Sequence, residues 1–317
     1  MNDLKQIFIG GCERSGTTLI GSILGAHPSC ICTPESQFIT HFYRRENFNP
    51  NKIDPFLILD VIRHHKRYRL EWKGALDFPK KYILENFYKY SEFLKWIARC
   101  YAETEGKTHV TWWIDQTPNN MKRAMTLIDL FPEALFIHLV RDGRAVSASL
   151  MNLEWGPNNV IRCAEYWLAK IAPGLILETT LGNDRVMRVY YEDLIQRPET
   201  VLSKICRFTG VPYSSEMVHS RGYKPAAYNQ KQHALVTGGL DTDRIVAWKK
   251  KLSFREIEMF EFITGETLKI LGYEQMFGLK ACPPTKKETV SLHLRNIYTR
   301  LANIIRQKSR VRKSLKR

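Results

Sequence analysis

The sequence lacks any apolar run that approaches the roughly 18 residues of a membrane-spanning helix, and no apolar signal segment precedes its first predicted strand. Its seven cysteines form no Cys-x-x-Cys pair, and no histidines and cysteines share the spacing of a zinc site. We therefore expect thiols in a reducing, cytoplasmic compartment, with neither a disulfide framework nor a metal site.

Negative charge is scarce at one end of the chain. Of the net charge of +16, residues 280–317 carry +11, from 12 Lys and Arg residues against one Glu, and the first 279 residues carry +5. The 317 residues are 44% hydrophobic, enough for one α/β domain of about 250–280 residues. We expect a domain at 1–279 and a separate basic tail at 280–317.

The basic tail carries an amphipathic pattern. Its apolar residues follow a 4-3-4-3 spacing, at Val290, Leu294, Ile297, Leu301 and Ile304. One interpretation is peripheral contact of 289–317 with an anionic membrane. The other is a helix docked on the body by this stripe. Nucleic acid is not an expected partner, because no recognition module accompanies the charge.

Strand-like and helix-like segments alternate through the body, which predicts a parallel sheet with helices on both faces. A helical insertion is expected at about 47–105, between the first and second strands. The strands are predicted at 5–9, 110–114, 134–140 and 185–191, and the helices at 17–26, 36–45, 55–68, 79–90, 91–105, 119–130, 143–152, 159–181, 198–209 and 253–271. A polar surface loop is predicted at 222–242.

Residues 10–18 read Gly-Gly-Cys-Glu-Arg-Ser-Gly-Thr-Thr, between a strand-like run and a helix-like run. The spacing Gly11-x4-Gly16 is that of a P-loop, in which backbone N–H groups and a helix start face an anion. Thr17 follows Gly16 where nucleoside triphosphatases carry a lysine that reaches the β- and γ-phosphates. Arg14 is the only cation of this segment, and its guanidinium suits a flat set of oxygens. The segment predicts an anion site that does not take a triphosphate.

A second anion site is predicted where the apolar strand 134–140 ends. Arg141 follows that strand, and Ser149 lies eight residues further on in the next predicted helix. Ligands of open α/β sheets bind at the carboxyl ends of strands. We therefore expect Arg141 and Ser149 to bind a second phosphate.

The two segments together resemble the sulfotransferase family that uses 3′-phosphoadenosine 5′-phosphosulfate (PAPS). In that family, Arg-Ser-Gly-Thr-Thr holds the 5′-phosphosulfate, and Arg-Asp-x-Arg-x-x-x-x-Ser after an apolar strand holds the 3′-phosphate. The resemblance spans about residues 5–275. Its Ala-His-Pro, Pro-Glu-Ser and Tyr-Glu-Asp-Leu motifs are most similar to tyrosylprotein sulfotransferases and related bacterial enzymes.

The resemblance implies a role for each matching residue. Arg14 would also stabilise charge on the transferring group, and Tyr191 would lie near the 3′-phosphate or the adenosine. The donor-binding residues implied are Arg14, Ser15, Gly16, Thr17, Thr18, Arg141, Ser149 and Tyr191.

Glu35 stands where the tyrosylprotein and bacterial enzymes place their catalytic base. A hydroxyl acceptor loses its proton as its oxygen attacks sulfur, and a positioned carboxylate accepts that proton. Glu35 at a helix start is also explained by the helix dipole alone. His41 is a rival base.

Two positions depart from the family pattern. Gln116 replaces a lysine that helps to stabilise the leaving group, and Ala247 precedes Trp248 where a basic residue is usual. Arg244, one turn upstream, is a candidate substitute for the second.

The sequence therefore predicts a sulfotransferase that transfers a sulfuryl group from PAPS, without a metal, to a hydroxyl of a peptide tyrosine, a carbohydrate or a lipid. One alternative is a P-loop kinase or phosphotransferase, because 110–115 resembles the apolar run plus Asp of a magnesium-binding nucleotide kinase. Against it stands the missing loop lysine. A non-enzymatic protein that binds anionic membranes through its tail is the other alternative.

Overall fold

A computed structural model provides the structure of the protein, and it describes residues 4–43, 45–76, 89–151, 153–219, 222–223, 240–297 and 299. By the contacts within it, the chain divides into two units. One comprises residues 1–140 and 173–241, and the other comprises 141–172 and 242–317. The domain boundary expected at residue 279 stays a prediction.

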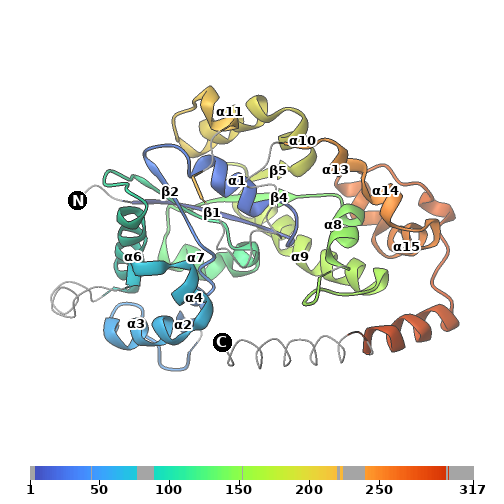
Figure 1. The fold of residues 1–317 in the computed structure, drawn as a ribbon, viewed down its shortest axis with the longest axis horizontal. Helices are drawn as coiled ribbons and strands as arrows, with labels where there is room; N and C mark the ends of the chain where they lie inside the picture. The colour runs from blue at the N-terminus through green and yellow to red at the C-terminus, as the bar shows by residue number, and fades with distance from the viewer. Residues whose placement is uncertain are drawn as a thin grey trace, which may run out of the picture. The chain divides into compact units, whose positions relative to one another are not determined.

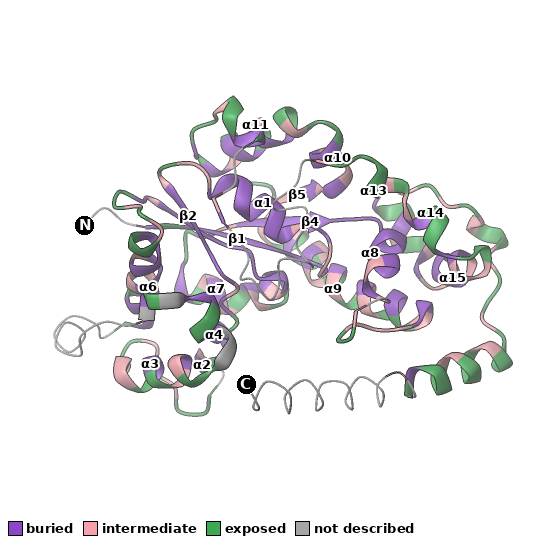
Figure 2. Ribbon diagram, in the orientation of Figure 1, coloured by how far each residue is buried: buried purple, intermediate pink, exposed green. Residues whose placement is uncertain are grey.

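The first unit is built on a parallel sheet (Figure 1). In the described residues the sheet has five strands in the order β2-β3-β1-β4-β5. They are β1 (Lys5–Gly11), β2 (Cys30–Thr33), β3 (Trp112–Asp115), β4 (Leu135–Val140) and β5 (Val186–Tyr190), and every neighbouring pair is parallel. Strands β1 to β4 are almost wholly buried, as near-continuous apolar runs in parallel sheets are, whereas β5 at the edge of the sheet is partly buried (Figure 2).

Helices cover both faces of this sheet, as the sequence predicted. Figure 1 shows α1 and α11 over one face and α6 and α7 over the other. The helical segments of the first unit are α1 (Thr17–Leu24), α2 (Phe38–Tyr43), α3 (Pro55–His64), α4 (Lys66–Glu71), η1 (Lys73–Leu76), α6 (Tyr90–Thr104), η2 (Pro118–Arg123), α7 (Ala124–Leu130), α10 (Tyr191–Gln196), α11 (Pro198–Thr209) and η3 (Ser215–Val218).

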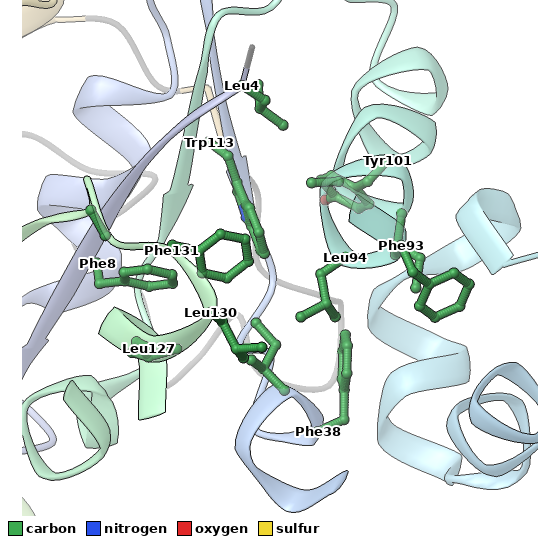
Figure 3. Packing of buried hydrophobic residues seen from close by; sticks show 14 of the residues in the cluster. Leu4, Phe8, Phe38, Phe93, Leu94, Tyr101, Trp113, Leu127, Leu130 and Phe131 are labelled. Atoms are coloured by element: carbon green, nitrogen blue, oxygen red, sulfur yellow. The ribbon is translucent and has the colours of Figure 1, made fainter. Parts of the chain in front are cut away.

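An aromatic core lies between the sheet and the α6 and α7 side (Figure 3). The ring centroid of Phe8 on β1 lies 6.1 Å from that of Trp113 on β3 and 5.8 Å from that of Phe131, which follows α7. Phe38 and Leu94 extend this cluster to α2 and α6. Much of the predicted insertion is therefore a packed helical layer.

The second unit is helical. It contains α8 (Gly143–Leu150), α13 (Asp243–Val246), α14 (Trp248–Lys251), α15 (Phe254–Ile270) and η5 (Gly278–Lys280), followed by a helix over 286–297. Helix α9 (Val160–Leu181) runs through the boundary between the units, and Pro173 stands inside it at that point. No helix within the described residues is both long and apolar enough to cross a membrane.

One strand along the chain was not predicted. Strand β2 was missed, so the insertion lies between β2 and β3 rather than between the first and second strands. β2 carries only one large apolar residue, Ile31, in its four positions, whereas β3, which has the same length, carries Trp112, Trp113 and Ile114. The predicted helix 119–130 begins as the 3-10 segment η2, and 55–68 is divided between α3 and α4. The predicted helix 79–90 and the loop 222–242 lie largely outside the described residues.

Candidate functional site

The predicted site residues lie where strands end. Because the strands are parallel, their carboxyl ends share one edge of the sheet. The loop 12–16 follows β1, Glu35 lies two residues beyond β2, and Gln116 follows β3. Arg141 follows the last residue of β4 in the chain, and Tyr191 follows β5.

The loop between β1 and α1 has an unusual backbone. Arg14 has φ 71° and Gly16 has φ 99°, both in the left-handed region. A left-handed arginine is strained, and residues of this kind cluster at functional sites. Alternation of right- and left-handed residues turns successive N–H groups toward one concavity, which binds anions. The first turn of α1 holds no acidic residue to offset the positive end of the helix.

Glycine is required at two positions of this segment because neighbours leave no room. A Cβ on Gly11 would lie 2.2 Å from the carbonyl oxygen of Leu139 on β4. A Cβ on Gly16 would lie 2.8 Å from Cδ2 of Tyr191. Tyr191 is wholly buried and packs directly on the loop. The structure thus brings together Gly16 and Tyr191, two of the predicted donor-binding residues.

The loop also contains a buried hydroxyl that is not satisfied. Ser15 is 0% exposed, and its Oγ has no hydrogen-bond partner among the described residues. Such a group destabilises a protein by about 1–3 kcal/mol. Together with the Arg14 backbone and the close fit at Gly16, it shows a cradle suited to a sulfate or phosphate group.

Thr17 and Thr18 are buried at the start of α1. The Thr18 hydroxyl donates a hydrogen bond to Oε1 of Gln116, at 2.8 Å. Gln116, the departure from the family pattern, is thus in direct contact with the start of α1, the helix that follows the anion-binding loop 12–16. Because the Thr18 hydroxyl donates its proton to Gln116, the donor that Thr18 can offer to an anion is its backbone N–H.

Glu35 is half-buried in the turn between β2 and α2, and Gln37 Nε2 donates to its Oε2 at 3.2 Å. The turn is held by the next residue. The Ser36 hydroxyl donates to the carboxylate of Asp115, and the Ser36 N–H donates to Thr117 Oγ1 at 2.9 Å.

Asp115, which the sequence offered only as the Asp of the kinase alternative, has a positioning role that sequence reasoning missed. It is fully buried at the end of β3, where it accepts from the Thr117 N–H at 2.9 Å and from Asn120 Nδ2 at 2.8 Å. Burial raises the pKa of this carboxyl, although these hydrogen bonds oppose the shift. Asn120 Nδ2 also donates to the carbonyl of Ile9 on β1, at 3.0 Å. The position of Asp115 at the end of an apolar strand was the signal in the sequence that could have indicated this role.

His41, the rival base, is exposed on α2, and its Nε2 lies 3.4 Å from Nη2 of Arg45. It lines a cavity of about 610 Å³. Ser36 and Gln37, the residues that follow Glu35, line the same cavity, as does Thr117.

In the second unit, Arg141 is mostly buried and Nη2 donates to the carbonyl of Arg244 at 3.2 Å. Trp167 Nε1 donates to the carbonyl of Arg141, also at 3.2 Å. The chain around Arg141 is therefore fixed from two sides. Ser149 is half-buried in the last turn of α8. Arg244, considered above as a substitute contact, is an immediate neighbour of Arg141.

The other arginine of this motif has a structural role that the sequence did not show. Asp142 caps α8, and Arg144 pairs with it at 2.8 Å and with Glu261 of α15 at 2.6 Å. The guanidinium carbon of Arg144 lies 4.1 Å from the ring centroid of Trp248. These contacts anchor the start of α8, directly after Arg141.

The structure has all seven cysteines as thiols, six buried and Cys282 exposed. In the described part of the chain, no three His, Cys, Asp or Glu residues are grouped so that they could hold a metal ion.

Comparisons with known proteins find relatives among the protein-tyrosine sulfotransferases. The chain is 27% identical over 219 residues to protein-tyrosine sulfotransferase A of Caenorhabditis elegans, covering 67% of this chain and 52% of that protein. It is 27% identical over 229 residues to protein-tyrosine sulfotransferase of Drosophila melanogaster, covering 68% and 40%. The chain thus spans about half the length of these curated relatives.

Among solved structures, the sulfotransferase domain of the Synechococcus PCC 7002 olefin synthase superposes with a TM-score of 0.59 at 22% identity. The match covers 86% of this chain and 97% of that one, and it shows a shared fold. The family model described as "Sulfotransferase family" matches residues 6–215, which include the anion loop, Glu35, Arg141 and Tyr191. On this match, the chain belongs to the sulfotransferase family.

Proposed function

We propose that the protein transfers a sulfuryl group from PAPS to a hydroxyl acceptor. The observation that carries this proposal is the loop after β1, with its left-handed Arg14 and its buried, unsatisfied Ser15 hydroxyl. The loop is shaped for an anion but has no lysine for a triphosphate. Bound PAPS would supply an activated sulfuryl group.

Donor binding is assigned to two groups of residues. In the loop, Arg14 and the Ser15 hydroxyl would contact the phosphosulfate, with N–H groups of Gly16, Thr17 and Thr18. Arg14, as a fixed cation in a partly buried site, stabilises the charge that develops on the sulfuryl and bridging oxygens.

For the 3′-phosphate, we assign Arg141 and Ser149. Hydrogen bonds hold both the guanidinium and the backbone carbonyl of Arg141. They support this assignment, because a guanidinium that is already held loses less conformational entropy when it binds. Tyr191 closes the wall of the loop at Gly16 and would lie beside the nucleotide.

Glu35 is proposed as the catalytic base, which takes the proton of the acceptor hydroxyl. Its turn is held by the buried Asp115 through Ser36, and the carboxylate itself is only half-buried. The carboxylate accepts from Gln37, which lines the cavity, and this connection supports proton transfer from an acceptor bound there. Gln116 is neutral, so charge stabilisation of the leaving group rests on Arg14.

A matched pair of measurements tests the proposal. Calorimetry should show binding of adenosine 3′,5′-bisphosphate and no comparable binding of magnesium ATP. Glu35→Gln should bind the bisphosphate like the wild type but lose about 10²-fold or more in turnover, while the exposed control Glu92→Gln on α6 keeps both. Tighter binding of magnesium ATP than of the bisphosphate would refute the donor, and full turnover of Glu35→Gln would refute the base.

We also propose that the tail contacts an anionic membrane. The helix over 286–297 begins with reciprocal hydrogen bonds between Thr285 and Glu288, and Glu288 pairs with Arg255 of α15 at 2.8 Å. The carbonyl of Leu292, on the same side, accepts from Asn159 at 3.3 Å. With about 100° between residues, Glu288 and Leu292 lie about 120–180° around the helix from the described residues of the apolar stripe.

The described part of the stripe is indeed exposed (Figure 2). The side chains of Val290 and Leu294 are 59% and 60% exposed. Lys286 and Lys287 lie about one helical turn before Val290 in the sequence. An apolar face flanked by lysines, followed by seven Lys and Arg residues in 306–317, suits anionic headgroups. Co-sedimentation with phosphatidylserine vesicles, lost in Leu294→Glu and absent with phosphatidylcholine, would support this contact. Equal recovery of the wild type and of Leu294→Glu in the supernatant with phosphatidylserine vesicles would refute it. The cytoplasmic location expected from the sequence stays a prediction.

A further inference from the structure

The cavity of about 610 Å³ beside Glu35 has a position that relates it to the transfer reaction. Ser36 and Gln37 form part of its wall, and Gln37 is hydrogen-bonded to the Glu35 carboxylate. Thr117, also in the wall, directly follows Gln116, which accepts from Thr18 at the start of α1. The cavity is therefore lined by the turn that carries the proposed base and by the segment that contacts the helix after the loop proposed to hold the sulfuryl group.

The charged groups in the cavity wall have one sign. Arg45 and Arg123 line it together with His41 and His65, and none of the described lining residues is Asp or Glu. The guanidinium carbon of Arg45 lies 4.6 Å from the ring centroid of Phe42, a cation–π contact that orients the side chain. A cavity with this lining attracts an anion and rejects a cation.

The uncharged part of the wall contains apolar residues and polar groups that are hydrogen-bonded within the protein. Phe42, Ile62 and Leu127 contribute apolar surface. Among the polar lining groups, Ser36 donates to Asp115, and Asn120 donates to Asp115 and to the carbonyl of Ile9. This apolar surface can pack against a flat hydrocarbon body.

The size of the cavity sets the scale of the ligand. Pockets of about 300–1,000 Å³ enclose most of the surface of a small organic molecule. The cavity thus accommodates a whole small acceptor.

We propose that this cavity is the acceptor site and that the acceptor is a small phenol bearing a carboxylate, phosphate or sulfate group, which Arg45 and Arg123 select. The inference rests on the proposed sulfuryl transfer. In the reaction, the phenol oxygen bonds to sulfur and its proton passes to Glu35. The bond from sulfur to the bridging oxygen breaks, and its electron pair leaves on the 5′-phosphate of adenosine 3′,5′-bisphosphate.

The test compares two phenols of nearly equal shape, 4-hydroxyphenylacetate and the neutral 4-hydroxyphenylacetamide. Their binding to protein saturated with adenosine 3′,5′-bisphosphate is measured by calorimetry, and their sulfation is measured with labelled donor. We expect the anion to bind at least tenfold more tightly than the amide. Arg45→Gln and Arg123→Gln should each reduce this preference several-fold, while Lys122→Gln, an exposed neighbour outside the cavity wall, keeps it.

The outcomes distinguish failure of the proposed function from failure of the proposed acceptor class. Failure to bind the bisphosphate refutes the proposed function. Normal bisphosphate binding with equal affinity for the two phenols, or an unchanged preference in both arginine variants, refutes the acceptor class alone. Sulfation of an acidic tyrosine peptide without sulfation of either phenol also refutes it, because the acceptor would then be a protein.

Discussion

The left-handed conformation of Arg14 allows its backbone and its side chain to be tested separately. Arg14→Ala and Arg14→Gly both remove the guanidinium, together with whatever contacts it makes. They differ only in whether residue 14 can adopt φ 71° without strain. Glycine populates this region as readily as the right-handed one, whereas alanine does not.

The expected difference in stability follows from two opposing effects. A non-glycine residue in the left-handed region costs about 1–2 kcal/mol. Glycine adds about 0.4–1 kcal/mol of unfolded-state entropy to be lost on folding. Arg14→Gly should therefore be more stable than Arg14→Ala by about 0.5–1 kcal/mol, a difference in Tm of about 1–3 °C for a chain of this size.

The effect on function should be the same for both variants. Loss of one charge-stabilising donor lowers turnover by about 10²–10³-fold, or about 2.7–4 kcal/mol. Differential scanning calorimetry without ligand and turnover at saturating donor measure the two effects. Equal Tm values in the two variants would show that the loop does not impose the left-handed conformation. Near wild-type turnover in either would show that Arg14 does not act on the transferring group.

Three further predictions concern buried groups. Ser15→Ala removes an unsatisfied hydroxyl, so without ligand it should be about 1 kcal/mol more stable than the wild type in urea unfolding, yet bind adenosine 3′,5′-bisphosphate more weakly; a loss of stability would mean that the hydroxyl is satisfied. Arg141→Ala should lose the calorimetric preference for adenosine 3′,5′-bisphosphate over AMP, and a retained preference would place the 3′-phosphate elsewhere. Glu261→Ala leaves the buried Arg144 with one carboxylate instead of two and should destabilise the protein by about 3–5 kcal/mol in urea unfolding; a change below about 1 kcal/mol would contradict a role for this ion pair.

Much of the fold and the anion loop could be predicted from local sequence, because both depend on neighbouring residues. The apolar runs of β1 and β4 and the glycine spacing of the loop are local patterns, and the helix Pro198–Thr209 has the predicted bounds. Strand β2 was missed because its four residues include only one large apolar side chain, that of Ile31. The resemblance rested on short motifs, and the family match supports it.

The residues that position the site could not be predicted in the same way. Arg144 has the sequence context of a ligand-binding arginine, but its partner Glu261 lies 117 residues away. Only the fold brings Arg144 and Glu261 together, and it shows that Arg144 forms a structural ion pair. The same holds for Gln116, whose contact with Thr18 spans 98 residues.

Asp115 shows most directly how the donor and acceptor sides of the site depend on each other. Through Ser36 it holds the turn that carries Glu35, and through Asn120 it is connected to the end of β1, from which the anion loop begins. A buried carboxyl with several hydrogen bonds has few alternative arrangements, because each broken bond leaves a polar group without water. The separation between the proposed base and the anion loop is therefore set by a residue that belongs to neither. A shift of this carboxyl would move the base relative to the loop, and misplacement by about 1 Å is enough to lower a transfer rate about 10²-fold.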